Sequence, residues 1–428
     1  MPLINWPRLR KNSNLSDKST TEMDKSMKSL SQSDIHSARE RIKDLIELTP
    51  CDYSEILSRL YGCHIYLKLE NLQITGSFKA RGAFNKMLQL TPEQRAAGVI
   101  AASAGNHAQG VAYAARQLGI AATIVMPETT PLAKIRGTEE LGASIVLYGS
   151  RYAEAFEKAS ELQQQQGYTF IHAFDDPQVI AGQGTLGLEV LEQIPDLDML
   201  VVPIGGGGLI AGSAVAIKYT RPEVHIVGAE AERIPAMKTS VEAGHITTCH
   251  PANTIADGIS IATVGEHTFP LVNQFIDEIV TVNEEQIASA IMMLLEREKT
   301  LTEGAGAVGF AALSHGYIDN IKDKKIVVVL SGGNIDMSLL TVILQRGMEN
   351  DGRLARLKVI IPDKPGNIAK LATLVADQHA NILEIYQHHS VNEVDIGETE
   401  VEMVLEAKCK AHIDAIIVSI KQCGYTIK

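Results

Sequence analysis

Between residues 98 and 167, short apolar runs alternate with longer stretches in which apolar residues recur at helical spacing. The apolar runs predict strands over 98–105, 121–127 and 143–149. The stretches that follow them predict helices over 106–119, 131–142 and 151–167. Repeated strand–helix alternation is typical of a parallel sheet covered by helices, so this region is expected to form one α/β lobe.

A second set of apolar runs predicts another lobe of the same class. Strands are expected over 198–205, 224–230 and 324–333, with a helix over 209–219. Two lobes of this kind leave a cleft between them in which a ligand can bind.

The pattern changes near residue 346. The remaining chain predicts strands over 356–363, 380–389, 400–407 and 425–428, and helices over 364–379 and 411–424. This βαββαβ order is the ferredoxin-like arrangement, which assigns no activity by itself. We expect a disordered extension over 1–33, which contains Trp6, a main unit over 34–345 with a small lobe at roughly 75–175, a linker over 346–352 and a separate unit over 353–428.

Composition narrows the possible partners. The 428 residues are 45% hydrophobic, which is enough to fill several cores, and the formal net charge is −12. Without a long Lys/Arg run, neither nucleic acid nor a membrane surface is expected as a partner. The five cysteines form no CxxC pair, which argues against a zinc site and disulfides and favours a cytoplasmic location. No metal is expected.

Lys79 stands among small residues in "TGSFKARGA". A lysine that only solvates a surface gains nothing from such neighbours, whereas an amine that reaches a bound molecule needs close approach of the backbone.

Two glycine motifs have different contexts. "PIGGGGLIAG" lies between a predicted strand and a helix, so the backbone N–H groups of 205–208 can converge on a phosphate; the alternative is a flexible turn. The GxGxxG at Gly304, Gly306 and Gly309 follows a polar segment instead of a strand, so we interpret it as close helix packing, not as a dinucleotide site.

Two further loops end predicted strands. "SAGNHAQG" can hold a carboxylate or simply cap a helix, with His107 orienting the loop, and "LSGGN" places Ser331 at a strand end. Together with the lysine and the glycines, these loops suit a phosphorylated aldehyde cofactor such as pyridoxal 5′-phosphate (PLP).

The motifs "TGSFKARGA", "SAGNHAQG", "GGGGL", "TIADGI", "EGAGA" and "SGGN", in this order, resemble the PLP enzymes of the tryptophan-synthase-β fold (fold type II) and specifically the threonine dehydratases, also called threonine ammonia-lyases. The resemblance covers about residues 35–345. The tail resembles an ACT domain through "IPDKPGNIAKL" and "ANI".

The resemblance implies roles for named residues. Lys79 is the Schiff-base lysine and the base for the α-proton, Phe78 lies against the pyridine ring, Asn106 meets the phenolic oxygen and Ser331 faces the ring nitrogen. The phosphate site implied is Gly205, Gly206, Gly207, Gly208 and Leu209. The loop implied for the substrate carboxylate is Ser103, Ala104, Gly105, Asn106 and His107.

The activity implied is that of a carbon–nitrogen lyase, which converts L-threonine to 2-oxobutanoate and ammonia as the first step towards isoleucine, with L-serine to pyruvate as a side activity. A hydroxyl at the ring nitrogen leaves the ring neutral, a weaker electron sink that favours prompt loss of the β-hydroxyl. The preference for threonine or serine stays open.

Three alternatives depart from the sequence at single positions. Serine racemases carry a serine where this chain has Ala104. Their divalent-metal site needs two carboxylates; this chain has one of them, Glu230, but has Ala236 at the position expected for the second. Threonine and cysteine synthases typically have an acidic residue in place of Ala80. A catalytically silent amino-acid sensor would have lost Lys79 or the glycines 205–208, and this chain has kept both.

For the tail, the ACT resemblance implies an amino-acid effector such as isoleucine or valine at Gly366, Asn367, Asn381 and Ile382. The alternative is a role in assembly alone. Relatives imply a homo-oligomer, a dimer or tetramer.

Overall fold

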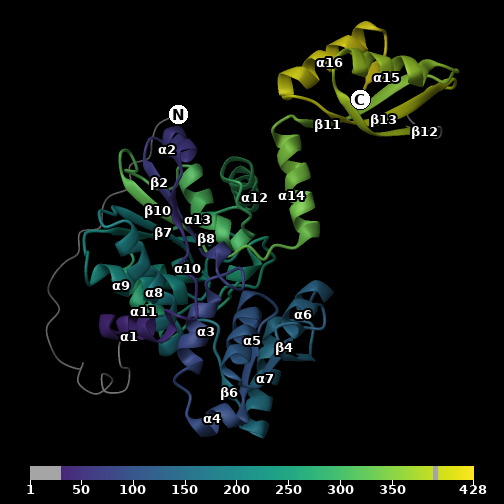
Figure 1. The fold of residues 1–428 in the computed structure, drawn as a ribbon. Helices are drawn as coiled ribbons and strands as arrows, with labels where there is room; N and C mark the ends of the chain where they lie inside the picture. The colour runs from purple at the N-terminus through teal and green to yellow at the C-terminus, as the bar shows by residue number, and fades with distance from the viewer. Residues whose placement is uncertain (1–29, 389–393) are drawn as a thin grey trace.

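The computed structural model describes residues 30–388 and 394–428. Three sheets organise them, two in the main body and one in a C-terminal unit that stands at the end of helix α14 (Figure 1). The α/β class and the ferredoxin-like tail predicted from the sequence are confirmed. Every helix in the described ranges is too short or too polar to cross a membrane.

The larger lobe is built on a six-stranded sheet with the order β1-β2-β10-β7-β8-β9, in which only β1 runs antiparallel to its neighbour. Its strands are β1 (Cys51–Tyr53), β2 (His64–Leu69), β7 (Met199–Pro203), β8 (His225–Ala231), β9 (Glu278–Val282) and β10 (Lys325–Leu330). The helices of this lobe are α1 (Gln32–Ile42), α2 (Glu55–Tyr61), α8 (Pro177–Gln193), α9 (Gly208–Lys218), α10 (Ala236–Ala243), α11 (Thr268–Phe275), α12 (Glu284–Met293), α13 (Gly304–Ser314) and α14 (Met337–Asn350). Short 3-10 turns occur at η1 (Glu70–Leu72) and η2 (Asp257–Ile259), and a π-helical turn at η3 (Leu294–Glu298).

Both faces of this sheet are buried, which explains why its central strands read as continuous apolar runs. In β10, Val328 packs with Phe310 of α13 on one face, while Val327 and Val329 pack with Ile210 of α9 on the other. Helix α13 contains the GxGxxG motif, and a Cβ at Gly304 would lie 2.1 Å from the carbonyl oxygen of Ile255. The interpretation of that motif as close packing is confirmed.

The smaller lobe is built on a parallel sheet with the order β5-β4-β3-β6. Its elements are α3 (Lys79–Met87), α4 (Pro92–Ala97), β3 (Val99–Ala102), α5 (Asn106–Leu118), β4 (Ala122–Met126), α6 (Leu132–Glu139), β5 (Ser144–Leu147), α7 (Tyr152–Gln166) and β6 (Thr169–Phe170). Residues of β3 alternate between a core shared with α3 and α5 and a core shared with α7. The lobe lies in sequence between β2 and β7 of the larger sheet.

The C-terminal unit has the order β11 (Leu354–Pro362), α15 (Asn367–Asp377), β12 (Asn381–His388), β13 (Glu398–Glu406), α16 (Lys410–Gln422) and β14 (Thr426–Ile427). The sheet is antiparallel, with the order β12-β13-β11-β14. Its core is its own: Val359 and Met403 of the sheet pack with Leu371 of α15 and Ile416 of α16.

Two expected boundaries differ from the structure. Helix α1 begins inside the expected extension, because Ser31 and Asp34 form a capping box and Leu30 is buried. Most of the expected linker, 346–352, is the last turn of α14, which continues until Gly352 adopts φ 67°. Residues 1–29, with Trp6, lie outside the described ranges.

Candidate active site

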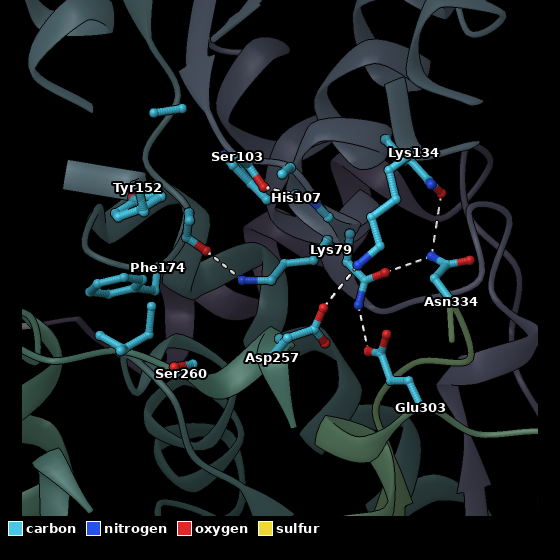
Figure 2. Close-up of a pocket in the computed structure, with 18 of the residues that line it drawn as sticks. Lys79, Ser103, His107, Lys134, Tyr152, Phe174, Asp257, Ser260, Glu303 and Asn334 are labelled. Atoms are coloured by element: carbon cyan, nitrogen blue, oxygen red, sulfur yellow. Dashed lines mark hydrogen bonds and ion pairs between the residues drawn. The ribbon is translucent and has the colours of Figure 1, made fainter. Parts of the chain in front are cut away.

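The carboxyl ends of β3, β7 and β10 direct their loops to one place, as parallel strands do. A cavity of about 520 Å³ lies there, lined from the smaller lobe by Lys79, the 103–107 loop and Lys134, and from the larger lobe by Asp257, Glu303 and Asn334. Figure 2 shows Lys79, Ser103, Lys134, Asp257, Glu303 and Asn334 around it. A narrow extension of about 40 Å³ reaches Ser331, Leu209 and the glycines 205–208.

Lys79 is the first residue of α3, and its segment is tied to the end of β10. The backbone N–H of Phe78 donates to the carbonyl of Ser331 at 3.2 Å, and Ser77 pairs with Gly332 as an isolated β-bridge. The amine donates to the carbonyl of Ala173 at 2.9 Å and lies 5.0 Å from the centroid of the Phe78 ring.

Burial lowers the pKa of the Lys79 amine to about 8, and the nearby carboxyl of Glu303 opposes this shift. A cavity that penalises the ammonium form supplies a neutral amine more readily than water does. The arrangement can therefore provide a nucleophile or a base near neutral pH.

The four glycines follow β7 and lead into α9, which begins at Gly208. Gly207 has φ 92°, and a Cβ at Gly206 would lie 2.2 Å from the ring of Phe174. Side chains are thus excluded, and the loop presents its backbone where the N-terminus of α9 favours an anion.

The 103–107 loop lies at the opposite wall, with Ser103, Ala104 and Gly105 lining the cavity before α5 begins at Asn106. The Nδ2 of Asn106 donates to Glu303 at 2.5 Å, and its Oδ1 accepts from Asn334 at 2.5 Å.

The contacts and the low pKa of His107 make it unsuited to acid–base catalysis. Its Nε2 lies 2.8 Å from the carbonyl of Ile171, and burial, with Lys79 adding to it, lowers the pKa of the imidazole to about 3. A neutral ring that holds the 103–107 loop against β6 agrees with the orienting role expected for it.

The family called "Pyridoxal-phosphate dependent enzyme" matches residues 42–332. The chain belongs to that family.

Relatives of this PLP-dependent enzyme share most of its length. An L-threonine ammonia-lyase of Thermotoga maritima is 45% identical over 395 residues, which cover 92% of this chain and 98% of that protein. A threonine deaminase of Solanum lycopersicum is similar with a TM-score of 0.70 and 41% identity, covering 73% of this chain and 90% of that one. A serine racemase of maize is similar with a TM-score of 0.71 and 34% identity, covering 75% and 99%.

The residues present fit PLP. The glycines form a cradle that a Cβ would fill, since one at Gly205 would lie 2.9 Å from Ile259. In the narrow extension the buried Nε2 of Gln183 has no protein hydrogen-bond partner in the described part of the chain, so it is a donor available to a ligand. Phosphate at the glycines and aldehyde at Lys79 would span these two groups.

Several cavity residues were not singled out from the sequence, namely Lys134, Phe174, Gln183, Asp257, Glu303 and Asn334. Three of them stand inside motifs that carried the resemblance, "TIADGI", "EGAGA" and "SGGN". Lys134 crosses between the lobes: its Nζ lies 2.9 Å from Asp257 and 3.9 Å from Asp336. Burial, with Asp257 adding to it, raises the pKa of Glu303 to about 7.

Glu230, weighed as a metal ligand, contacts the backbone at the start of α10. Its two carboxylate oxygens accept from the backbone N–H groups of Met237 at 2.9 Å and Lys238 at 2.8 Å. The carboxylate therefore caps the start of α10.

The residues considered for an effector are not brought together within one chain. Gly366 and Asn367 follow the end of β11, and Asn367 donates to the carbonyl of Pro362 at 3.0 Å. Asn381 pairs with Glu406, which in turn pairs with Leu354 at the start of β11. The two pairs are separated by the length of that strand, roughly 25 Å.

Proposed function

We propose that this enzyme converts L-threonine to 2-oxobutanoate and ammonia, and L-serine to pyruvate as a side activity. The observation that carries the proposal is the Lys79 amine, with its pKa of about 8, in one cavity with a glycine cradle and the Asn106 loop. The relatives named as threonine ammonia-lyase and threonine deaminase support the choice of substrate.

When bound, PLP supplies an aldehyde for the substrate amine and a conjugated ring that stabilises negative charge at the α-carbon. Gly205 to Gly208, with Leu209, would hold its phosphate, Gln183 would add a donor and Asn106 would meet the phenolic oxygen. Ser331 would face the ring nitrogen. A hydroxyl there does not force a proton onto the ring, which limits how far negative charge is delocalised.

With the cofactor and substrate bound, Lys79 would take the α-proton. Because its amine is held in a site that disfavours the charged form, it is neutral in time to accept the proton. The 103–107 loop binds the substrate carboxylate at the N-terminus of α5, where the helix dipole favours an anion. Ala104 has no group that can donate a proton to the opposite face, so the chain favours elimination over racemisation.

We further infer a division of labour, with catalysis in 34–345 and amino-acid binding in 353–428. The separate core of the C-terminal unit supports it. Strand β12 exposes Leu383, Ile385 and Tyr386, an apolar edge that supports pairing between copies in a homo-oligomer. Because Gly366 and Asn381 lie at opposite ends of the unit, an effector such as isoleucine or valine binds between two copies.

The five cysteines are free thiols, which supports a reducing, cytoplasmic location.

The test is an absorbance scan of the purified protein and of Lys79→Ala, followed by an assay of 2-oxo acid release from L-threonine and L-serine. We expect the visible band of a lysine-bound pyridoxal in the parent alone, with release of 2-oxobutanoate. A coloured protein that forms D-serine without oxo acid would assign a racemase instead, and a colourless protein would refute the enzyme. Addition of isoleucine or valine then tests the tail.

A further inference from the structure

Glu303 stands at a place where a carboxylate is costly. The residue precedes α13, is 4% exposed, and lines both the main cavity and its narrow extension. Its Oε1 accepts from the Nδ2 of Asn106 at 2.5 Å (Figure 2). Burial of an ionisable side chain needs a compensating role, because the charged form loses its hydration.

The surrounding backbone leaves room for this carboxylate. A Cβ at Gly332 would lie 2.3 Å from the Oε1 of Glu303 and 3.1 Å from the Nδ2 of Asn106. The carbonyl of Gly332 also accepts from the backbone N–H of Glu303 at 3.0 Å. The "SGGN" loop thus fixes the start of α13 while it makes space for the side chain.

Asn334 binds the carbonyl end of the Asn106 side-chain amide. Its Nδ2 donates to the carbonyl of Thr75 at 2.9 Å and to the Oδ1 of Asn106 at 2.5 Å. A Cβ at Gly76 would lie 2.7 Å from the Oδ1 of Asn334, so this contact too depends on a glycine.

The carbonyl of Thr75 at one end of this hydrogen-bonded chain and the carboxylate of Glu303 at the other fix the orientation of the Asn334 and Asn106 amides. A backbone carbonyl only accepts, so the side of Asn334 that faces Thr75 must be its NH₂ group. An ionised carboxylate also only accepts, so the side of Asn106 that faces Glu303 must be its NH₂ group as well. Neither amide can flip without placing an oxygen against an oxygen.

We propose that Glu303 and Asn334 are positioning residues that clamp the Asn106 amide from both sides, so that its second N–H is kept for the phenolic oxygen of PLP. This inference rests on the proposed function only through the contact of Asn106 with the cofactor. An amide N–H₂ has two donors, and Glu303 takes one of them. The second donor then has a constant direction during turnover.

The clamp has a pH dependence of its own. Burial, with Asp257 of η2 adding to it, raises the pKa of the Glu303 carboxyl, while the Asn106 hydrogen bond, Lys134 of α6 and Lys79 of α3 oppose this shift. Below a pH of about 7 the carboxyl becomes protonated and can donate as well as accept. The orientation of Asn106 is then held by Asn334 alone.

The experiment compares Glu303→Leu, Glu303→Gln and Asn334→Ala with the exposed control Glu232→Gln, each as the full-length protein. For each, PLP is titrated into stripped protein to obtain its dissociation constant, the visible band is recorded as a function of pH, and kcat and KM are measured with L-threonine.

Glu303→Leu and Asn334→Ala are each expected to weaken PLP binding and to lower kcat by about tenfold or more, with KM little changed. The first variant loses the charge-assisted hydrogen bond to Asn106, and the second loses the hydrogen bond from the Asn334 amide to Asn106. Glu303→Gln keeps an acceptor, so it should bind PLP nearly as well as the parent. In the parent, protonation of Glu303 is expected to change the visible band near pH 7, and this change should be absent from Glu303→Gln.

The proposal is overturned if Glu303→Leu and Asn334→Ala bind PLP and turn over like Glu232→Gln, or if Glu303→Gln keeps the spectral titration. Should Glu303→Leu fail to fold, Asn334→Ala and the titration of Glu303→Gln decide alone. A parent protein with the visible band but no oxo acid from threonine refutes the proposed function, and the binding and spectral comparison still tests the clamp.

Discussion

Arg81 is the perturbation that tests how the lysine-bearing helix is held. Two residues after Lys79 on α3, it is fully buried, and all five of its N–H donors are used: Nε and Nη2 bind Glu70 at 2.7 and 2.8 Å, Nη1 and Nη2 bind Glu189 at 2.5 and 2.8 Å, and Nη1 reaches Thr185 at 3.1 Å. Lys68 of β2 adds a second cation, 2.7 Å from Glu189. The charges of these two cations and two carboxylates therefore sum to zero.

Replacement by Gln leaves two buried carboxylates with one cation. Removal of one partner from a buried ion pair costs about 3 to 5 kcal/mol in the free energy of unfolding. At an unfolding entropy of about 2.1 cal/mol/K per residue, a unit of roughly 300 residues has an unfolding entropy of about 0.63 kcal/mol/K, so Tm should fall by about 5 to 8 °C. Arg59, whose side chain is 75% exposed and 3.5 Å from Glu55, is the matched control, and Arg59→Gln should move Tm by about 1 °C or less.

The assay is thermal unfolding of both variants and the parent, with saturating PLP and one scan rate. Burial alone would raise the pKa of Glu70, but Arg81 outweighs it and holds the pKa below 4.5. The stability that Glu70 contributes is therefore present above an unfolded pKa of 4.5 and is lost as pH falls through its folded pKa. Without Arg81 the folded pKa rises, so the gap between Arg81→Gln and parent should be smaller at about pH 5 than at about pH 7. An Arg81→Gln protein that melts within about 2 °C of Arg59→Gln would refute the reasoning.

Three further outcomes are expected. Gly206→Ala places a Cβ 2.2 Å from Phe174 and should weaken PLP binding about tenfold or more in a titration, whereas Gly137→Ala, whose Cβ meets only Gln109 at 3.9 Å, should bind like the parent. In stripped protein, reaction of Lys79 with an amine reagent, followed by mass spectrometry, should rise with pH through about 8; a midpoint at the ordinary 10.5 would contradict the burial argument. Ile416→Ala should cost the C-terminal unit about 2 to 5 kcal/mol and speed its proteolysis while threonine turnover without effector stays unchanged, and joint loss of both would refute separate cores.

The sequence predicts the order of elements well because burial on both faces makes β7 and β10 unbroken apolar runs, each followed by a glycine turn. Where the predicted elements differ from the structure, the cause is local. Helix α14 runs through the expected linker because that stretch contains good helix formers and its stop signal, Gly352, comes later than the change in pattern. Strand β12 was expected as a strand, but its exposure could not be, since that depends on what covers the sheet edge.

The candidate site was predictable where one motif carries one task, as for Lys79 and the glycine loop. Contacts between motifs were not: Asn106 meets Glu303 across 197 residues and Asn334 across 228. No periodicity links such positions, and only the order of strands in the sheets brings them together. The same holds for Lys68 and Glu189, which are 121 residues apart.

Helix α3 carries two basic side chains two residues apart: Arg81 is fully buried, and Lys79 is partly buried at the cavity. Around Arg81 every donor has a partner, and the carboxylates it binds keep it charged, which serves stability. Around Lys79 the balance is different: burial outweighs Glu303, and the pKa of each of these two groups moves towards its neutral form, to about 8 and about 7. Uncompensated burial of this kind raises the free energy of the fold, and at these two residues it occurs in the cavity where the cofactor is to be held. The fully paired network behind α3 supplies the rigidity that lets the helix carry such a lysine at its first residue.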